Sequence, residues 1–265
     1  MVTADGGGDG TYNTVNLVKN GKFKILSKRR DNLIGKIYSA ITLMLGMNPS
    51  RHHYKVMGLA PYVKNIHIQE PLKIFLKSLK VRGLSFVKNK EMKDYFFYFE
   101  NRLKNFRFDN ISGALQTFTE IRLRDWFKNI YLKTKQKNFV FSGGVANNVK
   151  ANKFLMNQKF IKNFFVPAGP GDENLSIGAS FCLIYDILGP AKTFNYIKPQ
   201  KNAYWGTSIN SKDIKSFKKH PVIKRNYRSK KDTNMNVIAS LLSKGEIIAF
   251  CQGPMEFGSR ALGHR

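Results

Sequence analysis

The sequence predicts an α/β fold, and three observations support that prediction. Residues 138–144, NFVFSGG, are typical of a short apolar strand that ends in a glycine turn, and a helical pattern follows from Ala146 to Asn157. Residues 164–169, FFVPAG, repeat the strand pattern, and a second helical pattern then continues to Leu188, before Gly189-Pro190. The chain has 265 residues, of which 42% are hydrophobic, so it is long enough for one large core or two smaller ones.

The first residues predict a glycine loop and a hairpin. Asp5 and Asp9 flank three glycines in ADGGGDG, which indicates a loop with two carboxylates. Residues 11–28 alternate apolar and polar side chains on either side of Asn20-Gly21, a dipeptide typical of a type I′ turn. On the second strand, Phe23 and Ile25 continue the alternation.

Helical patterns dominate the next hundred residues. One helix is expected over residues 33–46, with Gly46 at its end, and a loop over residues 51–62, RHHYKVMGLAPY. Residues 66–131 predict several helices, which we interpret as an insertion or helical subdomain with a scaffold role. In the last of these helices Asn110 is the expected cap, and one apolar stripe carries Ile111, Leu115, Phe118, Arg122 and Trp126.

We expect three regions along the chain. Residues 1–190 form the main domain, residues 191–233 form a polar connector, and residues 234–265 begin a second domain that is truncated. The last region predicts a helix over residues 235–243 with Gly245 as its C-cap, followed by a strand, EIIAFCQ.

Composition narrows the possible classes. No apolar run reaches the roughly 18 residues of a membrane-spanning helix, and the first residues do not resemble a signal peptide. Cys182 and Cys251 lie in apolar stretches, which predicts buried thiols in a reducing compartment, so we expect a cytoplasmic protein. The net charge of +28 is compatible with nucleic-acid binding, but lysines are spread along the chain and no nucleic-acid motif accompanies them, so nucleic acid is not the expected partner.

Glycine turns at strand ends suggest a site for a nucleotide. The backbone can approach a ligand closely at Gly143 and Gly144, and the free N–H groups at a helix start favour phosphate. A purely structural turn is the alternative, because such glycine pairs are common. Asp172, in PAGPGDENLSIGAS, has two possible roles, as a helix cap or as the ligand of a hard metal ion beside phosphate groups.

Taken together, the motifs resemble one family. The resemblance depends on five segments, which are, in chain order, DGGGDGTYNTVNLVKNGKF, KVMGLAPY, SGGVANNVKANKFL, VPAGPGDENLSIGAS and QGPMEFGSRALGHR. They are similar, in the same order, to the carbamoyltransferases that include nodulation-factor and antibiotic-tailoring O-carbamoyltransferases. The resemblance implies a main domain with the actin, sugar-kinase and heat-shock-chaperone type of fold, which is ribonuclease H-like, and a second, YrdC-like domain.

The resemblance also implies a reaction. Carbamoyl phosphate, ATP and water give carbamoyl-adenylate, pyrophosphate and inorganic phosphate, and the carbamoyl group then passes to a hydroxyl of a small-molecule acceptor. A divalent metal, iron or alternatively Mg²⁺, polarises the acyl oxygen in the family.

Roles carry over residue by residue from the family's motifs. The resemblance implies nucleotide-binding roles for Asp5, Gly7, Gly8, Gly143, Gly144, Asn147 and Gly171. It implies a metal-ligand role for Asp172. It implies catalytic contacts to phosphate or carbamoyl phosphate for Glu256, Arg260 and Arg265, with a structural hinge as the alternative for this junction.

The sequence departs from the family pattern in three places. No H-x-x-x-H motif precedes Asp5, and the adjacent His52 and His53 are expected to face solvent. Pro254 and Ser259 replace the family's usual Arg and Pro. We therefore expect a fragment of a longer enzyme, or a chain completed by a partner, that is inactive by itself.

Two other functions stay open. One is a tRNA-modifying relative of the threonylcarbamoyl transferases, although GSRALGHR is absent from that group. The other is a non-catalytic basic protein that binds nucleotides or RNA.

Overall fold

The protein is described by a computed structural model. It covers residues 1–8, 10–19, 22–30, 34–198, 202–228, 234–249 and 253–259. The chain forms two compact units, residues 1–197 and residues 198–265, and each is described by itself.

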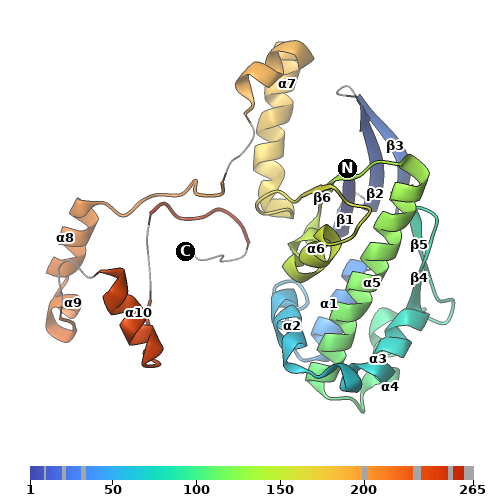
Figure 1. The fold of residues 1–265 in the computed structure, drawn as a ribbon, viewed down its shortest axis with the longest axis horizontal. Coiled ribbons are helices and arrows are strands. Elements are labelled where there is room, and N and C mark those ends of the chain that lie inside the picture. The colour runs from blue at the N-terminus through green and yellow to red at the C-terminus, as the bar shows by residue number, and fades with distance from the viewer. Residues whose placement is uncertain are drawn as a thin grey trace. The chain divides into compact units, whose positions relative to one another are not determined.

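A mixed sheet of five strands organises the first unit (Figure 1). The strand order is β3-β2-β1-β6-β7. β1 pairs antiparallel with β2 and parallel with β6, while β3 and β7 form the two edges. The strands are β1 (Val2–Gly8), β2 (Thr11–Lys19), β3 (Lys22–Arg29), β6 (Asn138–Ser142) and β7 (Asn163–Phe165). The α/β prediction is therefore confirmed for this unit.

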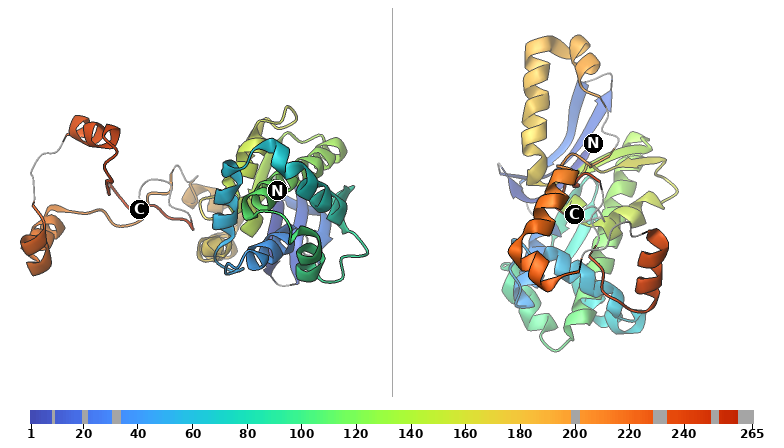
Figure 2. Two further views of the ribbon diagram at one scale, coloured as in Figure 1. Left: turned by 90° about the horizontal axis from the view of Figure 1, so that it is seen from below. Right: turned by 90° about the vertical axis from the view of Figure 1, so that its left-hand side faces the viewer.

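The long helix α5 (Phe108–Thr134) packs against one face of this sheet (Figure 1, Figure 2). Phe127 on α5 contacts the rings of Phe139 and Phe141 on β6, at centroid distances of 5.2 and 5.3 Å. Strand residues point alternately to opposite faces, so Val140 lies on the other face, where it is 39% exposed. Two further helices are α1 (Ile34–Met44) and α6 (Val149–Met156). Tyr38 on α1 and Asn148, the N-cap residue of α6, both form hydrogen bonds with Gln116 on α5.

The middle of the chain belongs to this same core. Its elements are α2 (His53–Leu59), η1 (Ala60–Tyr62), α3 (Asn65–Ser78), β4 (Leu79–Arg82), β5 (Ser85–Lys88) and α4 (Tyr95–Leu103). The ring of Phe75 on α3 lies 5.1 Å from that of Phe99 on α4 and 5.6 Å from that of Phe118 on α5. The middle residues, which were expected to form an insertion or helical subdomain, pack into the first unit, because these rings join one continuous apolar cluster that reaches the sheet.

Several local predictions for this region need correction. Residues 53–62 are helical, although a loop was expected there, and β4 and β5 form a hairpin between the expected helices. The N-cap of α5 is Arg107, so Asn110 lies inside the helix. The predicted stripe is confirmed, since Ile111, Leu115, Phe118 and Trp126 are all buried.

The N-terminal hairpin is confirmed by the pairing of β2 with β3, although its turn lies outside the described residues. Phe23 and Ile25 on β3 remain 64% and 62% exposed. The expected glycine loop was wrong as far as Gly8, because β1 extends through these glycines. The expected helix from residue 146 to 157 is divided into η2 (Gly144–Asn147) and α6.

The elements after β7 are helical. η3 (Asp172–Asn174) leads into α7 (Leu175–Tyr196), where Gly189 has a φ of 71° and interrupts the helix at the predicted place. In the second unit, α8 (Ser211–Lys219) and α9 (Pro221–Asn226) occupy the segment expected to be a connector. α10 (Met235–Ser243) matches its prediction, but residues 246–249 are not in a strand.

Two further expectations concern thiols and membranes. Cys182 is exposed, so its predicted burial was wrong, and Cys251 lies outside the described residues. Within the part of the chain that the structure describes, we find no helix of the length and apolarity needed to cross a membrane.

Candidate functional site

The parallel pairing of β1 with β6 brings two glycine segments side by side. Val2 pairs with Phe141 and Thr3 pairs with Ser142, so both strands approach the same edge of the sheet in register. The residues that follow, Ala4-Asp5 on β1 and Gly143-Gly144 after β6, therefore lie next to each other. In open α/β sheets, ligands bind outside the carboxyl ends of the strands.

Gly143 is the first residue of the glycine turn, residues 143–148, and the packing of this turn requires a glycine there. Its φ is 96° and its ψ is 164°, a conformation that is essentially restricted to glycine. A Cβ atom at this position would overlap the carbonyl group of Ala4. At Gly144, a Cβ atom would lie 3.0 Å from Oδ1 of Asp5. The Asp5 carboxylate therefore borders the glycine turn, and its Oδ1 accepts a hydrogen bond from the Gly6 backbone N–H.

The segment before α7 lies at the same carboxyl ends of β1 and β6. The Gly143 N–H donates to the carbonyl oxygen of Pro170 at 2.8 Å, and the Ser142 hydroxyl donates to the same oxygen at 3.0 Å. A Cβ atom on Gly171 would lie 3.3 Å from Nδ2 of Asn147. Asp5, Gly143, Gly144, Asn147 and Gly171 are thus brought together from three segments that are distant in the sequence.

Gly7 and Gly8 lie further along β1 and have different surroundings. A Cβ atom on Gly7 would lie 2.5 Å from Cε1 of Tyr12, which is a structural reason for glycine at this position. Gly8 is paired with Thr11 and is exposed, with no atom near its Cβ direction. Asp9, the second carboxylate of this stretch, lies outside the described residues.

Asp172 stays a predicted metal ligand. Its side chain is exposed at the start of η3, and no group of three His, Cys, Asp or Glu side chains is gathered for a metal among the described ranges. A divalent metal ordinarily takes more protein ligands than one aspartate offers. Asp172 also does not cap the following helices, since Gly171 and Asn174 occupy the N-cap positions of η3 and α7.

The two adjacent histidines are half-buried, so the expectation that they face solvent was wrong. Nε2 of His53 lies 3.0 Å from the Ser39 hydroxyl, and Nδ1 of His52 accepts from the Asn48 backbone N–H at 3.2 Å. The first contact attaches α2 to α1, and the second lies within the turn that precedes α2.

The predicted catalytic junction belongs to the second unit. Glu256 is buried, with 9% of its surface exposed. Its segment pairs with residues 203–208, through a bridge from Ser208 to Pro254 and through the stacked rings of Trp205 and Phe257, 5.0 Å apart. Arg260 and Arg265 lie outside the described residues. The roles of all three stay predictions.

Two buried polar residues lie beside the turn, Gln116 on α5 and Asn148 at the N-cap of α6. The sequence singled out Asn148 as a possible contact for a ribose or base, but it did not indicate Gln116. The two side chains exchange two hydrogen bonds, at 3.1 and 2.9 Å. A signal was present, because Ser112, Gln116 and Thr119 recur at helical spacing and are buried, so a polar line runs beside the apolar stripe of α5.

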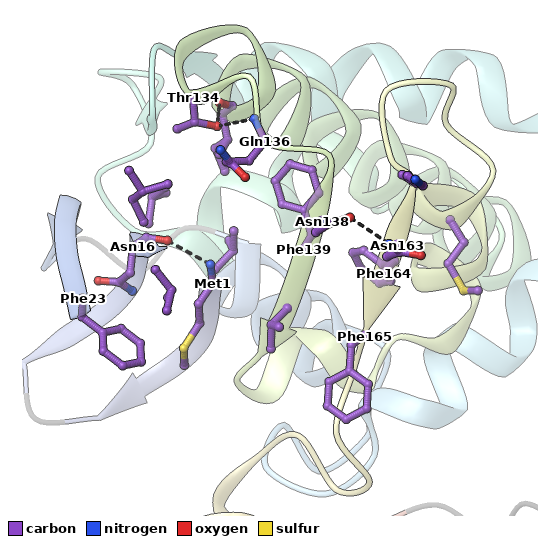
Figure 3. A pocket seen from close by; sticks show the side chains of 18 residues that line it. Met1, Asn16, Phe23, Thr134, Gln136, Asn138, Phe139, Asn163, Phe164 and Phe165 are labelled. Atoms are coloured by element: carbon purple, nitrogen blue, oxygen red, sulfur yellow. Dashed lines mark hydrogen bonds between the residues drawn. The ribbon is translucent and has the colours of Figure 1, made fainter. Parts of the chain in front are cut away.

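A separate pocket of about 780 Å³ lies at the opposite ends of the strands (Figure 3). Its walls include Met1, Phe23, Phe139 and Phe165, which are apolar side chains. None of the predicted site residues that belong to the described ranges lines it. This pocket therefore does not belong to the candidate site.

Comparison with known proteins assigns the family. Residues 1–181 match the family described as Carbamoyltransferase N-terminus. The chain is 26% identical to Uncharacterized protein MJ1058 of Methanocaldococcus jannaschii, over 287 aligned residues that cover 100% of this chain and 46% of that protein.

Two nodulation proteins are also similar. Nodulation protein NolO of Bradyrhizobium diazoefficiens is 25% identical over 98% of this chain and 48% of its own length. Nodulation protein NolNO of Sinorhizobium fredii is 25% identical over 100% of this chain and 39% of its own length. The chain thus spans about half the length, or less, of these relatives. The match over residues 1–181 shows that the chain belongs to the carbamoyltransferase family.

Proposed function

We propose that this chain provides the nucleotide-binding part of a carbamoyltransferase. The complete enzyme transfers a carbamoyl group from carbamoyl phosphate, through an ATP-derived carbamoyl-adenylate, to a hydroxyl group of a small-molecule acceptor. In the transfer step the acceptor oxygen bonds to the carbamoyl carbon, the bond to the adenylate phosphate breaks, and AMP and a proton are released. Family membership and the likeness to the two nodulation proteins support this reaction class.

The observation that carries the proposal is the parallel β1–β6 pair, which places Asp5 next to Gly144. Backbone N–H groups at the start of η2 favour phosphate oxygens, and Gly144 adds no side chain that would keep a ligand away. The Asp5 carboxylate repels phosphate, so its role in the proposal is to accept a hydrogen bond from a ribose hydroxyl. The amide of Asn147 can contact the same ligand from the other side of the turn.

Calorimetric titration of ATP into the full chain tests this proposal. We expect Asp5→Asn to weaken ATP binding about tenfold, because a charged acceptor of a hydrogen bond contributes on the order of 1.5–3 kcal/mol. Asp186→Asn is the matched control, since Asp186 is an exposed carboxylate on α7 and lies outside the candidate site. Equal ATP affinity for Asp5→Asn and the control, or no ATP binding by the unaltered chain, would contradict the proposed site.

A further inference from the structure

The side chain of Gln116 is polar, lies in the middle of α5 and is only 1% exposed. Its Oε1 accepts hydrogen bonds from Nδ2 of Asn148 at 2.9 Å and from the Tyr38 hydroxyl at 3.3 Å. Its Nε2 donates to Oδ1 of Asn148 at 3.1 Å and to Oε1 of Glu120 at 2.9 Å. A glutamine amide has two acceptor positions and two N–H donors, so these four bonds use its whole capacity.

Glu120 fixes which way the Gln116 amide is turned. An ionised carboxylate only accepts hydrogen bonds, so Nε2 must face Glu120, and a rotated amide would bring Oε1 against the carboxylate oxygen. The orientation of Asn148 follows, because its Nδ2 must face Oε1 of Gln116 and its Oδ1 must face Nε2. The same Oδ1 accepts from the Ala151 N–H at 3.0 Å, which caps α6.

Asn148 is also the last residue of the glycine turn. Its backbone N–H donates to the carbonyl oxygen of Val145 at 3.1 Å, and Asn147 precedes it directly. At the other end of the turn, Gly143 is held against Ala4 and bonded to Pro170. The segment 143–148 is therefore anchored at both ends, and Gln116 supplies the side-chain anchor at its second end.

We infer that Gln116 is a positioning residue for the 143–148 turn. It contacts no ligand itself, and it determines where Asn147 and the backbone N–H groups of the turn point. The effect on a ligand rests on the proposed function, since the ligand of this turn is the nucleotide named there. The effect on the turn itself does not depend on that proposal.

Gln116→Glu tests the inference with a change of nearly equal size. When the introduced carboxyl group is ionised, it cannot donate to Asn148 or Glu120, and the nearby Glu120 charge raises its pKa. When it is protonated, it can donate one hydrogen bond and so restores part of the network. Gln69→Glu is the matched control, because Gln69 is exposed on α3 and bonds only locally to the Asn65 carbonyl oxygen.

The first readout is hydrogen–deuterium exchange without any ligand. In Gln116→Glu, backbone amides of residues 144–149 should exchange faster than in Gln69→Glu, while peptides from β1 and from the C-terminal half of α5 should be unchanged. Faster exchange spread evenly over residues 1–197, in step with a lower melting temperature, would mean that Gln116 only supports the fold and would overturn the inference. Unchanged exchange in the turn would overturn it as well.

The second readout is the ratio of the ATP dissociation constants of Gln116→Glu and the unaltered chain. Protonation of ATP changes both constants by the same factor, so it cancels in this ratio. We expect a ratio of about ten near neutral to mildly alkaline pH, which falls toward one as acid protonates the introduced carboxylate. A ratio that does not depend on pH would contradict the hydrogen-bonding role. If the unaltered chain does not bind ATP, the proposed function fails, and the exchange measurement still decides the inference about Gln116.

Asn148→Asp provides a second variant if Gln116→Glu does not fold. Aspartate keeps an oxygen that can accept from the Ala151 N–H, so the cap of α6 is retained, but it loses the donor that bonds Oε1 of Gln116. Faster exchange confined to residues 144–149 is again the expected result. Exchange identical to that of the unaltered chain would overturn the inference.

Discussion

Gly143 determines the geometry of the turn because two constraints meet at this one residue. Its backbone adopts a conformation that side chains disfavour, and its α-carbon lies against the backbone of Ala4. Gly46, after α1, has a φ of 74° but no atom within 4 Å of the position a Cβ would take. Gly46 therefore provides a reference for a positive φ without a close contact, whereas Gly143 combines a more restricted conformation with a close contact.

Gly46→Ala should lower the free energy of unfolding by about 1–2 kcal/mol, the cost of a left-handed conformation alone. Gly143→Ala should lower it by roughly 3 kcal/mol or more, because the methyl group also has to displace a strand of the sheet. Urea denaturation of the two variants measures both values. Equal losses would show that neither the conformation of Gly143 nor its contact with Ala4 costs more than the positive φ of Gly46.

At the scale of elements, one partly buried guanidinium, that of Arg122, joins α5 to the end of α3. Nη2 of Arg122 donates to the carbonyl oxygen of Leu76 at 2.7 Å, and Nε donates to that of Leu79 at 2.6 Å. Carbonyl groups at the end of a helix have no partner within the helix and carry the negative end of its dipole. Burial lowers the pKa of the Arg122 guanidinium, and Asp125 opposes that effect.

Arg122→Met should lower the free energy of unfolding by about 2–3 kcal/mol, since it leaves buried carbonyl groups without donors. Arg124→Met is the matched control. Arg124 is on the same helix and pairs with the adjacent Asp125, but its side chain is 40% exposed, so the expected loss is below about 1 kcal/mol. Chemical denaturation of the two variants compares the losses, and a similar value for both would argue against the role of Arg122 at the end of α3.

At the scale of the whole molecule, charge is the dominant property. The net charge is +28, and exposed lysines occur in both units, for example Lys22 and Lys24 on β3 and Lys212 and Lys218 on α8. Charges spread in this way attract any polyanion without reading its sequence or shape.

Binding of RNA to the full chain should therefore be nonspecific and sensitive to salt. We expect tRNA and an unstructured RNA of equal length to bind alike at low ionic strength, and we expect affinity to fall by on the order of a thousandfold between 50 and 200 mM salt. Filter binding or fluorescence anisotropy measures both trends. Salt-resistant binding with a preference for tRNA would favour the tRNA-modifying alternative.

Local sequence patterns were sufficient for the long or strongly periodic elements. The stripe of α5, the β2–β3 hairpin, α1, α10 and the interruption at Gly189 follow from neighbours in the chain, because periodicity and turn residues act over a few positions. The seven-residue α2, the lysine-rich α8 and the four-residue strands of the β4–β5 hairpin were missed, since short or strongly polar segments carry little apolar pattern.

The candidate site, like the fold, was predicted from the sequence only in its local features. The sequence alone predicted the turn at Gly143-Gly144, the carboxylate at Asp5 and the motifs that indicate a carbamoyltransferase, because these depend on residue type and local order. Only the tertiary structure decided that β1 pairs with β6, that Pro170 accepts from Gly143, and that Gln116 anchors Asn148. These contacts join residues far apart in the chain, and no local preference of the backbone or of a side chain determines which distant partner it meets.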